Sequence, residues 1–535
     1  MKQLWHGGTI YTMEQEHETV EAVLVEDDKI AATGTVEELQ GQADECMDLQ
    51  GAVMYPGFVD SHLHMIFQGE KLIRLDLSKA RSAEEMLEMI RQAADNTPAD
   101  KWLFGEGWNE NNFAEPRIPT KEELDAIRTE PILLTRVCHH VVLGNSSALA
   151  AGGLTKESEA PAGGEIGRNE DGELNGLLYD LASTAVTDAL PKEGEDYIEY
   201  LTEALNLAID DMLSVGLTGG HTEEMHYFGE FTNPLTAFKR AIGEKRHFRV
   251  NLLRHNAVFE EMEKANVAFD EPFVEPGAMK IFADGALGGS TAALLEPYTD
   301  QPDNKGLLIQ TDEQLEELVK LARRYKEAVA VHIIGDAAAE QVLSAIEKYP
   351  APSGKRDRLI HACVVNEALI ERMAKLPVVV DLQPSFVTSD FPWVINRLGD
   401  DRINYAYPWK TLMDRGILCA GGTDAPVEEI NPLLSIYAAV ERKKPGSGAA
   451  HTGYLPEQKL SRFEAIRLYT VGSAQAICKE HERGLIKTGY TADFSIFDRD
   501  LFAGTSEDML KAQAVKTVVA GRTVFEQAQP IVTVQ

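Results

Sequence analysis

Hydrophobic and polar residues follow a repeating pattern through the middle of the chain. Short apolar runs are separated by longer stretches whose apolar residues recur at helical spacing. The runs that predict strands are residues 132–137, 248–253, 278–282, 328–333, 358–365, 378–382 and 417–420, and the clearest helical stretches are 311–328 and 338–349. Strands that alternate with helices predict a (β/α)8 barrel rather than an open sheet, because no Gly-x-Gly-x-x-Gly loop follows the first strand.

The two ends of the chain have a different pattern, which is typical of β-hairpins. Residues 20–32 hold two apolar runs around an acidic turn, and residues 515–525 hold two more around Ala520-Gly521. We expect the two ends to meet in one small β-domain. The predicted division is a composite β-sandwich from 1–55 and 485–535 beside a barrel domain of 56–484.

Residues 66 to about 200 are too many for one strand and one helix of the barrel, so they predict an insertion. Within it, the Gly-rich segment 159–176 predicts a lid or a loop hairpin rather than a linker between domains.

Charge and cysteine content narrow the class of protein. The 535 residues include 51 basic and 86 acidic side chains, a net charge of −35, which argues against nucleic acid or an anionic membrane as a partner. The five cysteines form no CxxC pair, and the sequence has neither a signal-like apolar start nor a run long enough to span a bilayer. We therefore expect a cytoplasmic protein with reduced cysteines that acts on a small molecule. Homo-oligomerisation is left open.

A pair of histidines closes the apolar segment 53–65. Because side chains alternate along an extended strand, His62 and His64 point to the same face. Two imidazoles on one face at the end of a strand can hold one metal ion, and a barrel carries its chemistry at that end.

Four further candidate ligands follow later apolar runs. Lys280, His332, His361 and Asp424 each lie at or just after the end of a predicted strand. The spacing between them places the whole set on strands one, four, five, six and eight. Five strand ends of this kind in one chain predict a metal site, although a single histidine there is more often structural.

The residue types also define the chemistry. Imidazoles and carboxylates suit zinc and its first-row neighbours, and two such ions lower the pKa of water held between them. A protonated Lys280 has no lone pair for a cation, but carbamylation by CO2 would supply two oxygens that bridge two metals. Asp424 could bind one metal, accept a proton from the attacking water and pass it to a leaving nitrogen.

At this point the sequence resembles the amidohydrolase superfamily and, within it, the YtcJ-like amidohydrolase-3 group that includes N-substituted formamide deformylases. The resemblance covers nearly the whole chain, and its marks are residues 56–64 (PGFVDSHLH), 280–288 (KIFADGALG), 332–336 (HIIGD), 422–427 (GTDAPV) and 484–493 (GLIKTGYTAD). The resemblance implies two divalent metals. His62, His64, Lys280 and Asp424 would hold one, and Lys280, His332 and His361 the other. It also implies the composite sandwich of the two chain ends.

Residues that contact the substrate are harder to predict. The segment from Arg136 to His140 is similar to the family's Arg-x-Asp-Gly-His motif, with Cys138 and His139 in place of the usual Asp-Gly. We name Arg136 and His140 as candidate substrate contacts, with a structural hydrogen bond as the alternative for His140. For His221, which also ends an apolar run, we expect a structural role.

These observations predict a metal-dependent hydrolase that cleaves a C–N bond of an amide, with an N-substituted formamide or a similar small amide as the substrate. The cofactor would be two zinc ions, with manganese, iron or nickel as alternatives, bridged by the carbamate on Lys280. A mononuclear deaminase of the same superfamily is the first alternative, but it would leave Lys280 without a role. A catalytically silent metal-binding scaffold is the second, and the intact Asp424 argues against it.

Overall fold

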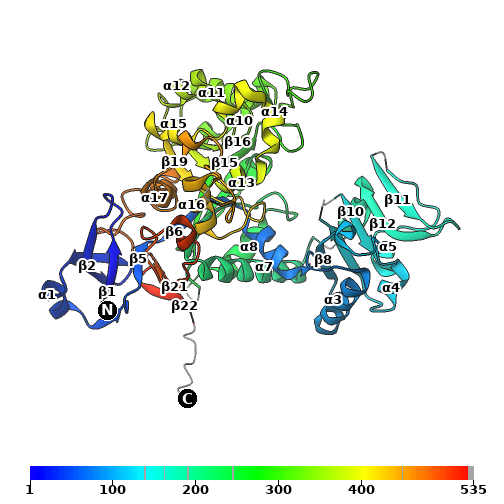
Figure 1. The fold of residues 1–535 in the computed structure, drawn as a ribbon, viewed down its shortest axis with the longest axis horizontal. Coiled ribbons are helices and arrows are strands. Elements are labelled where there is room, and N and C mark those ends of the chain that lie inside the picture. Colours follow the sequence, from blue (N-terminus) through cyan, green and yellow to red (C-terminus); the bar gives the residue numbers. More distant parts are fainter. Residues whose placement is uncertain are drawn as a thin grey trace, which may run out of the picture. The chain divides into compact units, whose positions relative to one another are not determined.

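The computed structural model describes residues 1–99, 101–137, 140–161, 163–189, 192–243, 246–448 and 450–527. These residues form two compact units, one of residues 1–68 and 201–535 and the other of residues 69–200, and each unit is described by itself (Figure 1). Within the described ranges no helix is both long enough and apolar enough to cross a membrane.

A parallel sheet of eight strands forms the centre of the larger unit. In spatial order the strands are β6 (Phe58–Leu63), β13 (Leu217–Glu223), β14 (Arg249–His255), β15 (Val274–Phe282), β16 (Val329–Ile333), β17 (Asp357–His361), β18 (Val378–Leu382) and β19 (Leu418–Gly421). Each strand lies beside the next barrel strand along the chain, with β7 to β12 of the other sheet (residues 75–180) inserted between β6 and β13, and this is the strand order of a (β/α)8 barrel. The first and last strands meet through two bonds just beyond their ends, from Asp424 N to His62 O (2.8 Å) and from His64 N to Ala425 O (2.7 Å). The predicted barrel is confirmed.

Helices follow most of the barrel strands and cover the outer face of the barrel sheet. The helices of this unit are α1 (Val36–Leu39), α8 (Thr232–Ala241), α9 (Asn256–Lys264), α10 (Asp312–Arg324), α11 (Asp336–Lys348), α12 (Glu367–Met373), α13 (Ser385–Asp390), α14 (Trp393–Arg402), α15 (Trp409–Asp414), α16 (Pro432–Glu441), α17 (Arg462–Arg467), α18 (Ser473–Ala476) and α19 (Ser506–Met509), while α2 (Met65–Ile73) and α7 (Glu195–Ser214) begin or end in the other unit. The two helices expected from spacing are α10 and α11, and α10 begins with a capping box of Thr311 and Gln314.

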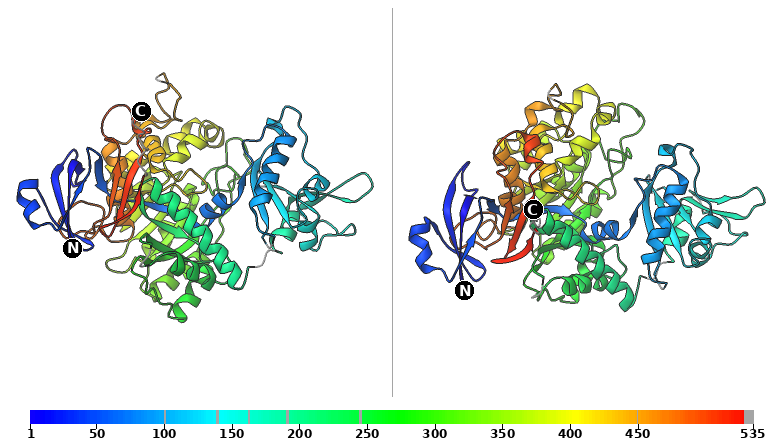
Figure 2. Two further views of the ribbon diagram at one scale, coloured as in Figure 1. Left: turned by 90° about the horizontal axis from the view of Figure 1, so that it is seen from below. Right: turned by 60° about the horizontal axis from the view of Figure 1, so that its bottom comes forward.

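The chain ends form a second sheet of the same unit. Its strands run in the order β22 (Arg522–Glu526), β21 (Ala514–Val519), β20 (Phe494–Phe497), β5 (Val53–Pro56), β1 (Lys2–Tyr11), β2 (Thr19–Glu26) and β3 (Lys29–Gly34), and β4 (Glu45–Asp48) pairs with β1. Antiparallel pairing of β5 with β20 joins the two ends of the chain, and Figure 2 shows the blue and red strands side by side. The predicted hairpins are β2 with β3 and β21 with β22.

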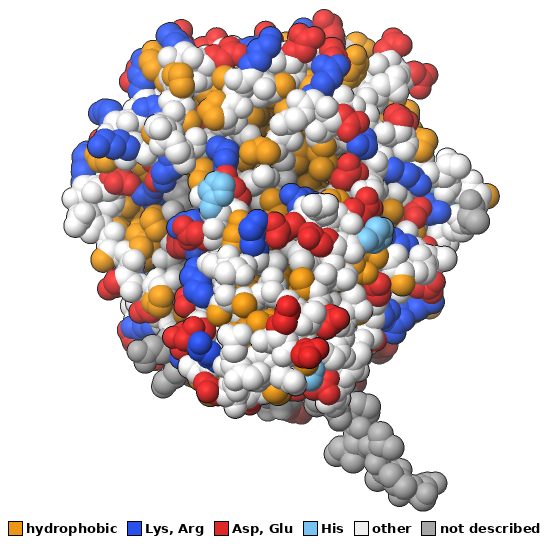
Figure 3. Space-filling model, turned by 90° about the vertical axis from the view of Figure 1, so that its left-hand side faces the viewer, with side chains coloured by type: hydrophobic (Ala, Val, Ile, Leu, Met, Phe, Trp, Pro, Cys, Tyr) orange, Lys and Arg blue, Asp and Glu red, His pale blue; other side chains and the backbone are white. Residues whose placement is uncertain are grey.

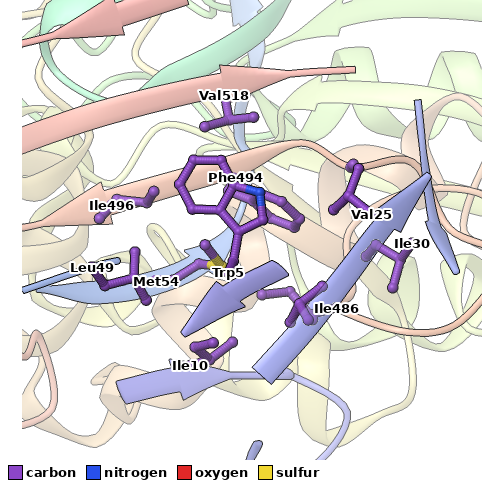
Figure 4. Close-up of a cluster of buried hydrophobic side chains, with 12 residues drawn as sticks. Trp5, Ile10, Val25, Ile30, Leu49, Met54, Ile486, Phe494, Ile496 and Val518 are labelled. Carbon is purple, nitrogen blue, oxygen red and sulfur yellow. The ribbon is translucent and has the colours of Figure 1, made fainter. Parts of the chain in front are cut away.

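A compact apolar core holds this second sheet together. Figure 4 shows Trp5 at its centre, with its ring edge-on to Phe494 at a centroid distance of 6.0 Å. Ile486 and Val518 from the far end of the chain pack into the same cluster. Both ends of the sequence are therefore needed to bury this core, which confirms the composite sandwich.

Residues 69–200 have a sheet and hydrophobic cores of their own. The strands run in the order β11 (Gly164–Arg168), β12 (Leu174–Asp180), β10 (Val141–Gly144), β9 (Ile132–Arg136), β8 (Leu103–Trp108) and β7 (Leu75–Asp76), with α3 (Ala83–Asn96), α4 (Lys121–Asp125), α5 (Ser146–Ala151) and α6 (Thr184–Thr187). The apolar run at 132–137 is therefore β9 of this sheet and not a barrel strand. The Gly-rich segment supplies the β11–β12 hairpin.

The large negative charge does not gather into one patch on the face seen in Figure 3. Acidic and basic side chains are interspersed there, with apolar side chains between them.

Candidate metal centre

The six predicted ligands come together at the carboxyl ends of the barrel strands. His62 lies near the end of β6, with His64 just after it. Lys280, His332 and His361 lie at or near the ends of β15, β16 and β17, and Asp424 follows β19. In the barrel these are strands one, four, five, six and eight. Side chains up to 362 residues apart in sequence thus share one end of the barrel.

Three of these side chains form a tight group. Asp424 Oδ1 lies 3.5 Å from His62 Nε2 and 3.3 Å from His64 Nε2, and the three atoms lie within 4.8 Å of one another. The Nδ1 of His64 donates to Glu223 O at 3.0 Å, which leaves Nε2 facing the group to take either a proton or a cation. Asp424 Oδ1 is buried with no hydrogen-bond partner among the described residues. This donor set fits a divalent cation.

The pKa values of His64 and Asp424 also support a cation site. Burial opposes protonation of His64, but the adjacent carboxylate of Asp424 outweighs burial and raises the pKa of the imidazole to about 9. Burial also opposes ionisation of Asp424, yet His64, His361 and Lys280 hold its pKa below the usual range. The pair of His64 and Asp424 therefore carries a proton when no cation is bound. Binding of a cation would release that proton.

Lys280, His332 and His361 form the other half of the centre. Lys280 is fully buried, its Nζ lies 3.4 Å from His62 Nε2, and burial lowers its pKa to about 8. The ring of His361 lies 4.7 Å from that of His332 and 5.5 Å from that of His62, measured between centroids. Burial holds the pKa of His361 to about 4 and that of His332 well below its ordinary value, so both rings are neutral.

Hydrogen bonds outside the centre fix which nitrogen of each ring is free. His332 Nε2 donates to Gly285 O at 3.0 Å, so its lone pair is on Nδ1. His361 Nδ1 donates to Gln383 Oε1 at 2.7 Å, so its lone pair is on Nε2. Such second partners orient a ligating imidazole and set its tautomer.

A hydrogen-bonded seam fixes β6 against β19. Asp60 is fully buried and accepts from His62 N (3.0 Å), Thr423 N (3.0 Å) and Thr423 Oγ1 (2.7 Å). Gly422 lies against this carboxylate, because a Cβ built there would be 2.6 Å from Asp60 Oδ1. The seam therefore sets the distance between the histidine pair and Asp424.

Two of the six residues have left-handed backbone. The φ angles of His361 and Asp424 are 76° and 59°. Non-glycine residues adopt this conformation at a cost, and such residues concentrate at functional sites.

An ion pair lies inside the barrel next to the centre. Arg358 makes two bonds of 2.9 Å to Asp381, and its Nη2 donates to Ser61 O. His221 lies nearby, is buried, and lines a cavity of about 20 Å³ that Asp493 also lines. No hydrogen bond or ring contact of His221 with the six residues appears among the described residues, and its structural role stays a prediction.

Aromatic side chains surround the centre, and we did not predict them from the sequence. Phe67 and Tyr227 lie against His64 at centroid distances of 5.9 and 6.3 Å, and Phe282 lies 5.2 Å from His332. Phe386 stacks on His361 at 5.7 Å. All four are partly exposed, so they form an apolar rim. Phe282 could have been found, because it points to the same face of its strand as Lys280.

Glu223 is a further site residue that we did not predict from the sequence. It ends β13 and is fully buried, and burial raises the pKa of its carboxyl group to about 8 against the charges of Lys280 and His64. The signal was present, since Glu223 follows His221 by two residues and therefore shares its face.

The two candidate substrate contacts belong to the unit of residues 69–200. Arg136 binds Glu110 through two bonds of 2.9 and 3.0 Å, and its guanidinium lies over the ring of Trp108. His140 is exposed, and its Nδ1 lies 2.9 Å from Asp180 Oδ1. Cys138 and His139 between them lie outside the described residues.

Known proteins resemble this chain along most of its length. A model of the amidohydrolase family matches residues 45–525. YtcJ of Bacillus subtilis is 47% identical over 99% of the chain and 100% of its own length, and the N-substituted formamide deformylase of Arthrobacter pascens is 26% identical over 97% and 98%. A solved structure of an uncharacterized metal-dependent hydrolase from Pyrococcus furiosus has a TM-score of 0.79 at 29% identity, over 94% of this chain and 100% of that one.

Proposed function

The chain belongs to the amidohydrolase family, and from this membership we propose that it is a metal-dependent hydrolase of C–N bonds in small amides. The observation that carries the proposal is the meeting of four imidazoles, the carboxylate of Asp424 and a buried lysine at one end of the barrel. A relative named as an N-substituted formamide deformylase supports an N-substituted formamide or a similar small amide as the substrate.

Two zinc ions are the cofactor that we propose, with manganese, iron or nickel as alternatives. His62, His64, Lys280 and Asp424 would hold one ion, and Lys280, His332 and His361 the other. Lys280 would serve both as a carbamate, which forms when its neutral amine adds CO2 and loses a proton. Burial of Lys280 favours that neutral amine.

The metals would activate water and polarise the amide carbonyl. Asp424 would accept a proton from that water on its carboxylate and deliver it to the nitrogen that leaves. His64 Nε2, 3.3 Å from Asp424 Oδ1, would hold the same ion as this carboxylate. Phe67, Tyr227 and Phe282 would exclude bulk water from the reacting amide, because they present apolar surface at the rim. We keep Arg136 and His140 as proposed substrate contacts.

The test combines metal analysis with turnover. Protein prepared without chelators and loaded with zinc or manganese should hold about two ions per chain and release amine and acid from a panel of N-substituted formamides and small amides. Chelation should abolish this activity. The Asp424→Asn variant, prepared in the same way, controls for a contaminating hydrolase.

Two results would contradict the proposal. A single ion per chain together with release of ammonia from an aminated ring would favour a mononuclear deaminase. Full metal loading with no turnover across the panel would favour a silent metal-binding scaffold.

A further inference from the structure

The side chain of Glu223 points into the barrel. A Cβ on Gly220 would lie 3.1 Å from Met212 on the outer helix α7, so Gly220 and Thr222 face the helices. Side chains alternate along a strand, and Glu223 therefore faces the interior. Its backbone oxygen accepts from His64 Nδ1, so the residue lies directly beside the candidate metal centre.

The carboxylate of Glu223 differs from the other buried carboxylates of the barrel. Asp60 accepts three hydrogen bonds, Asp284 accepts three backbone N–H groups and Asp381 holds Arg358. Glu223 is equally buried, but neither Oε1 nor Oε2 has a hydrogen-bond partner among the described residues. A buried carboxyl group without donors is strongly destabilising unless a cation compensates it.

We propose that Glu223 is a further acidic residue of the metal centre, whose carboxylate faces the bound cations and compensates part of their charge. This inference rests on the metal centre of the proposed function. Of the six proposed ligands only Asp424 is anionic as the chain is made, so two divalent cations leave an excess of positive charge in a buried site. Glu223 reduces that excess and positions the cations through charge without touching the substrate.

The test measures zinc affinity and thermal stability of the full-length protein with Glu223→Gln. Zinc affinity, from competition with a chromophoric chelator, should fall about tenfold or more, the scale found when groups outside the ligand set are removed. The chelated variant should melt no lower than the chelated wild type, because the substitution breaks no hydrogen bond of the carboxyl group. A purely structural role would lower that temperature and leave zinc affinity unchanged.

Asp357→Asn is the matched control. Asp357 is a buried carboxylate at the start of β17, and His361 lies at the opposite end of this strand. Arg323 (2.6 Å) and Val329 N (2.9 Å) hold the carboxylate in place. Its loss should lower the melting temperature of the chelated protein and leave zinc affinity as it is. Should Glu223→Gln fail to fold, Glu223→Met fills a similar volume without polar atoms and gives the same comparison.

The outcomes separate this inference from the proposed function. Zinc affinity of both Glu223 variants within twofold of wild type would overturn the inference and leave the metal centre intact. A wild-type protein that binds no zinc or manganese would overturn both.

Discussion

Replacing Gly422 with alanine should part the ends of β6 and β19 and weaken metal binding. The added Cβ would lie 2.6 Å from Asp60 Oδ1, 2.6 Å from His62 N and 2.9 Å from His62 O. Two of these atoms are backbone, and the third belongs to a carboxylate that three hydrogen bonds hold in place. The clash cannot be relieved by turning a flexible side chain.

The size of the displacement follows from these distances. Ordinary contacts of a Cβ begin near 3.4 Å, so one strand end must move by about 0.8 Å. His62 lies on one side of the gap and Asp424 on the other, 3.5 Å apart at their ligand atoms. Because a metal site tolerates ligand displacements of about 0.2 Å, we expect zinc affinity to fall tenfold or more. The overpacking itself should cost about 1–3 kcal/mol of folding free energy.

The assay is zinc competition against a chromophoric chelator, with thermal unfolding of the chelated and zinc-loaded forms. Gly41→Ala is the control, since a Cβ there meets nothing within 4 Å and its φ is not left-handed. We expect the control to match wild type in both measurements. If Gly422→Ala lowers the melting temperature but keeps wild-type zinc affinity, the seam does not set the ligand geometry and this reasoning is wrong.

Three further predictions concern the centre and the joint with the chain ends. Asp424→Asn should keep the fold and most of the metal but lower turnover roughly a hundredfold, the scale of a lost general base, and near wild-type turnover on the best amide would exclude Asp424 as the proton carrier. Lys280→Ala should lose metal and activity and recover part of both with short carboxylic acids, whereas a bare lysine in a fully metal-loaded crystal structure would rule out the carbamate. Arg249→Met should cost about 3–5 kcal/mol in denaturant unfolding at pH 7, because it leaves Asp493 buried without the arginine at 2.6 Å. Burial opposes ionisation of Asp493, but Arg249 holds its pKa below the usual range. This contribution to stability is therefore present above the unfolded pKa of about 4 and is lost as the pH falls below that value, so a gap between variant and wild type that stays constant well below pH 4 would contradict it.

The meeting of the six proposed ligands at one end of the barrel could be predicted, because the barrel imposes a simple rule. Apolar runs mark the strands, and polar residues at their carboxyl ends meet at one edge. For this reason His62 and His332 could be identified as candidate ligands from the sequence. Alternation along β6 was enough to put His62 and His64 on one face, and no knowledge of the neighbouring strands was needed.

What the sequence did not reveal depends on contacts between strands. Glu223 is followed by another glutamate, and two adjacent carboxylates after an apolar run have the pattern of a solvated loop. Alternation puts Glu223 on the face of His221, but it takes the register, which sets Glu223 beside His64, to show that the carboxylate is buried. Phe67 and Tyr227 were also missed from the sequence, because an aromatic residue near a strand end is more often part of a core. The apolar run at 132–137 met the strand rule but belongs to a separate sheet, because periodicity does not tell which sheet a strand joins.

Metal binding and closure of the barrel depend on the same few atoms. The backbone bonds that join β6 to β19 start or end at His62, His64 and Asp424, which are also the three side chains that face one another most closely. A cation between these side chains would therefore hold together the first and last strands of the barrel, which are more than 350 residues apart in sequence. Binding to the folded state stabilises that state, so the metal would contribute to the fold as well as to the chemistry. This shared role explains why Asp60 and Gly422, which bear no ligand atom for a metal in the proposed scheme, are packed as tightly as the centre itself.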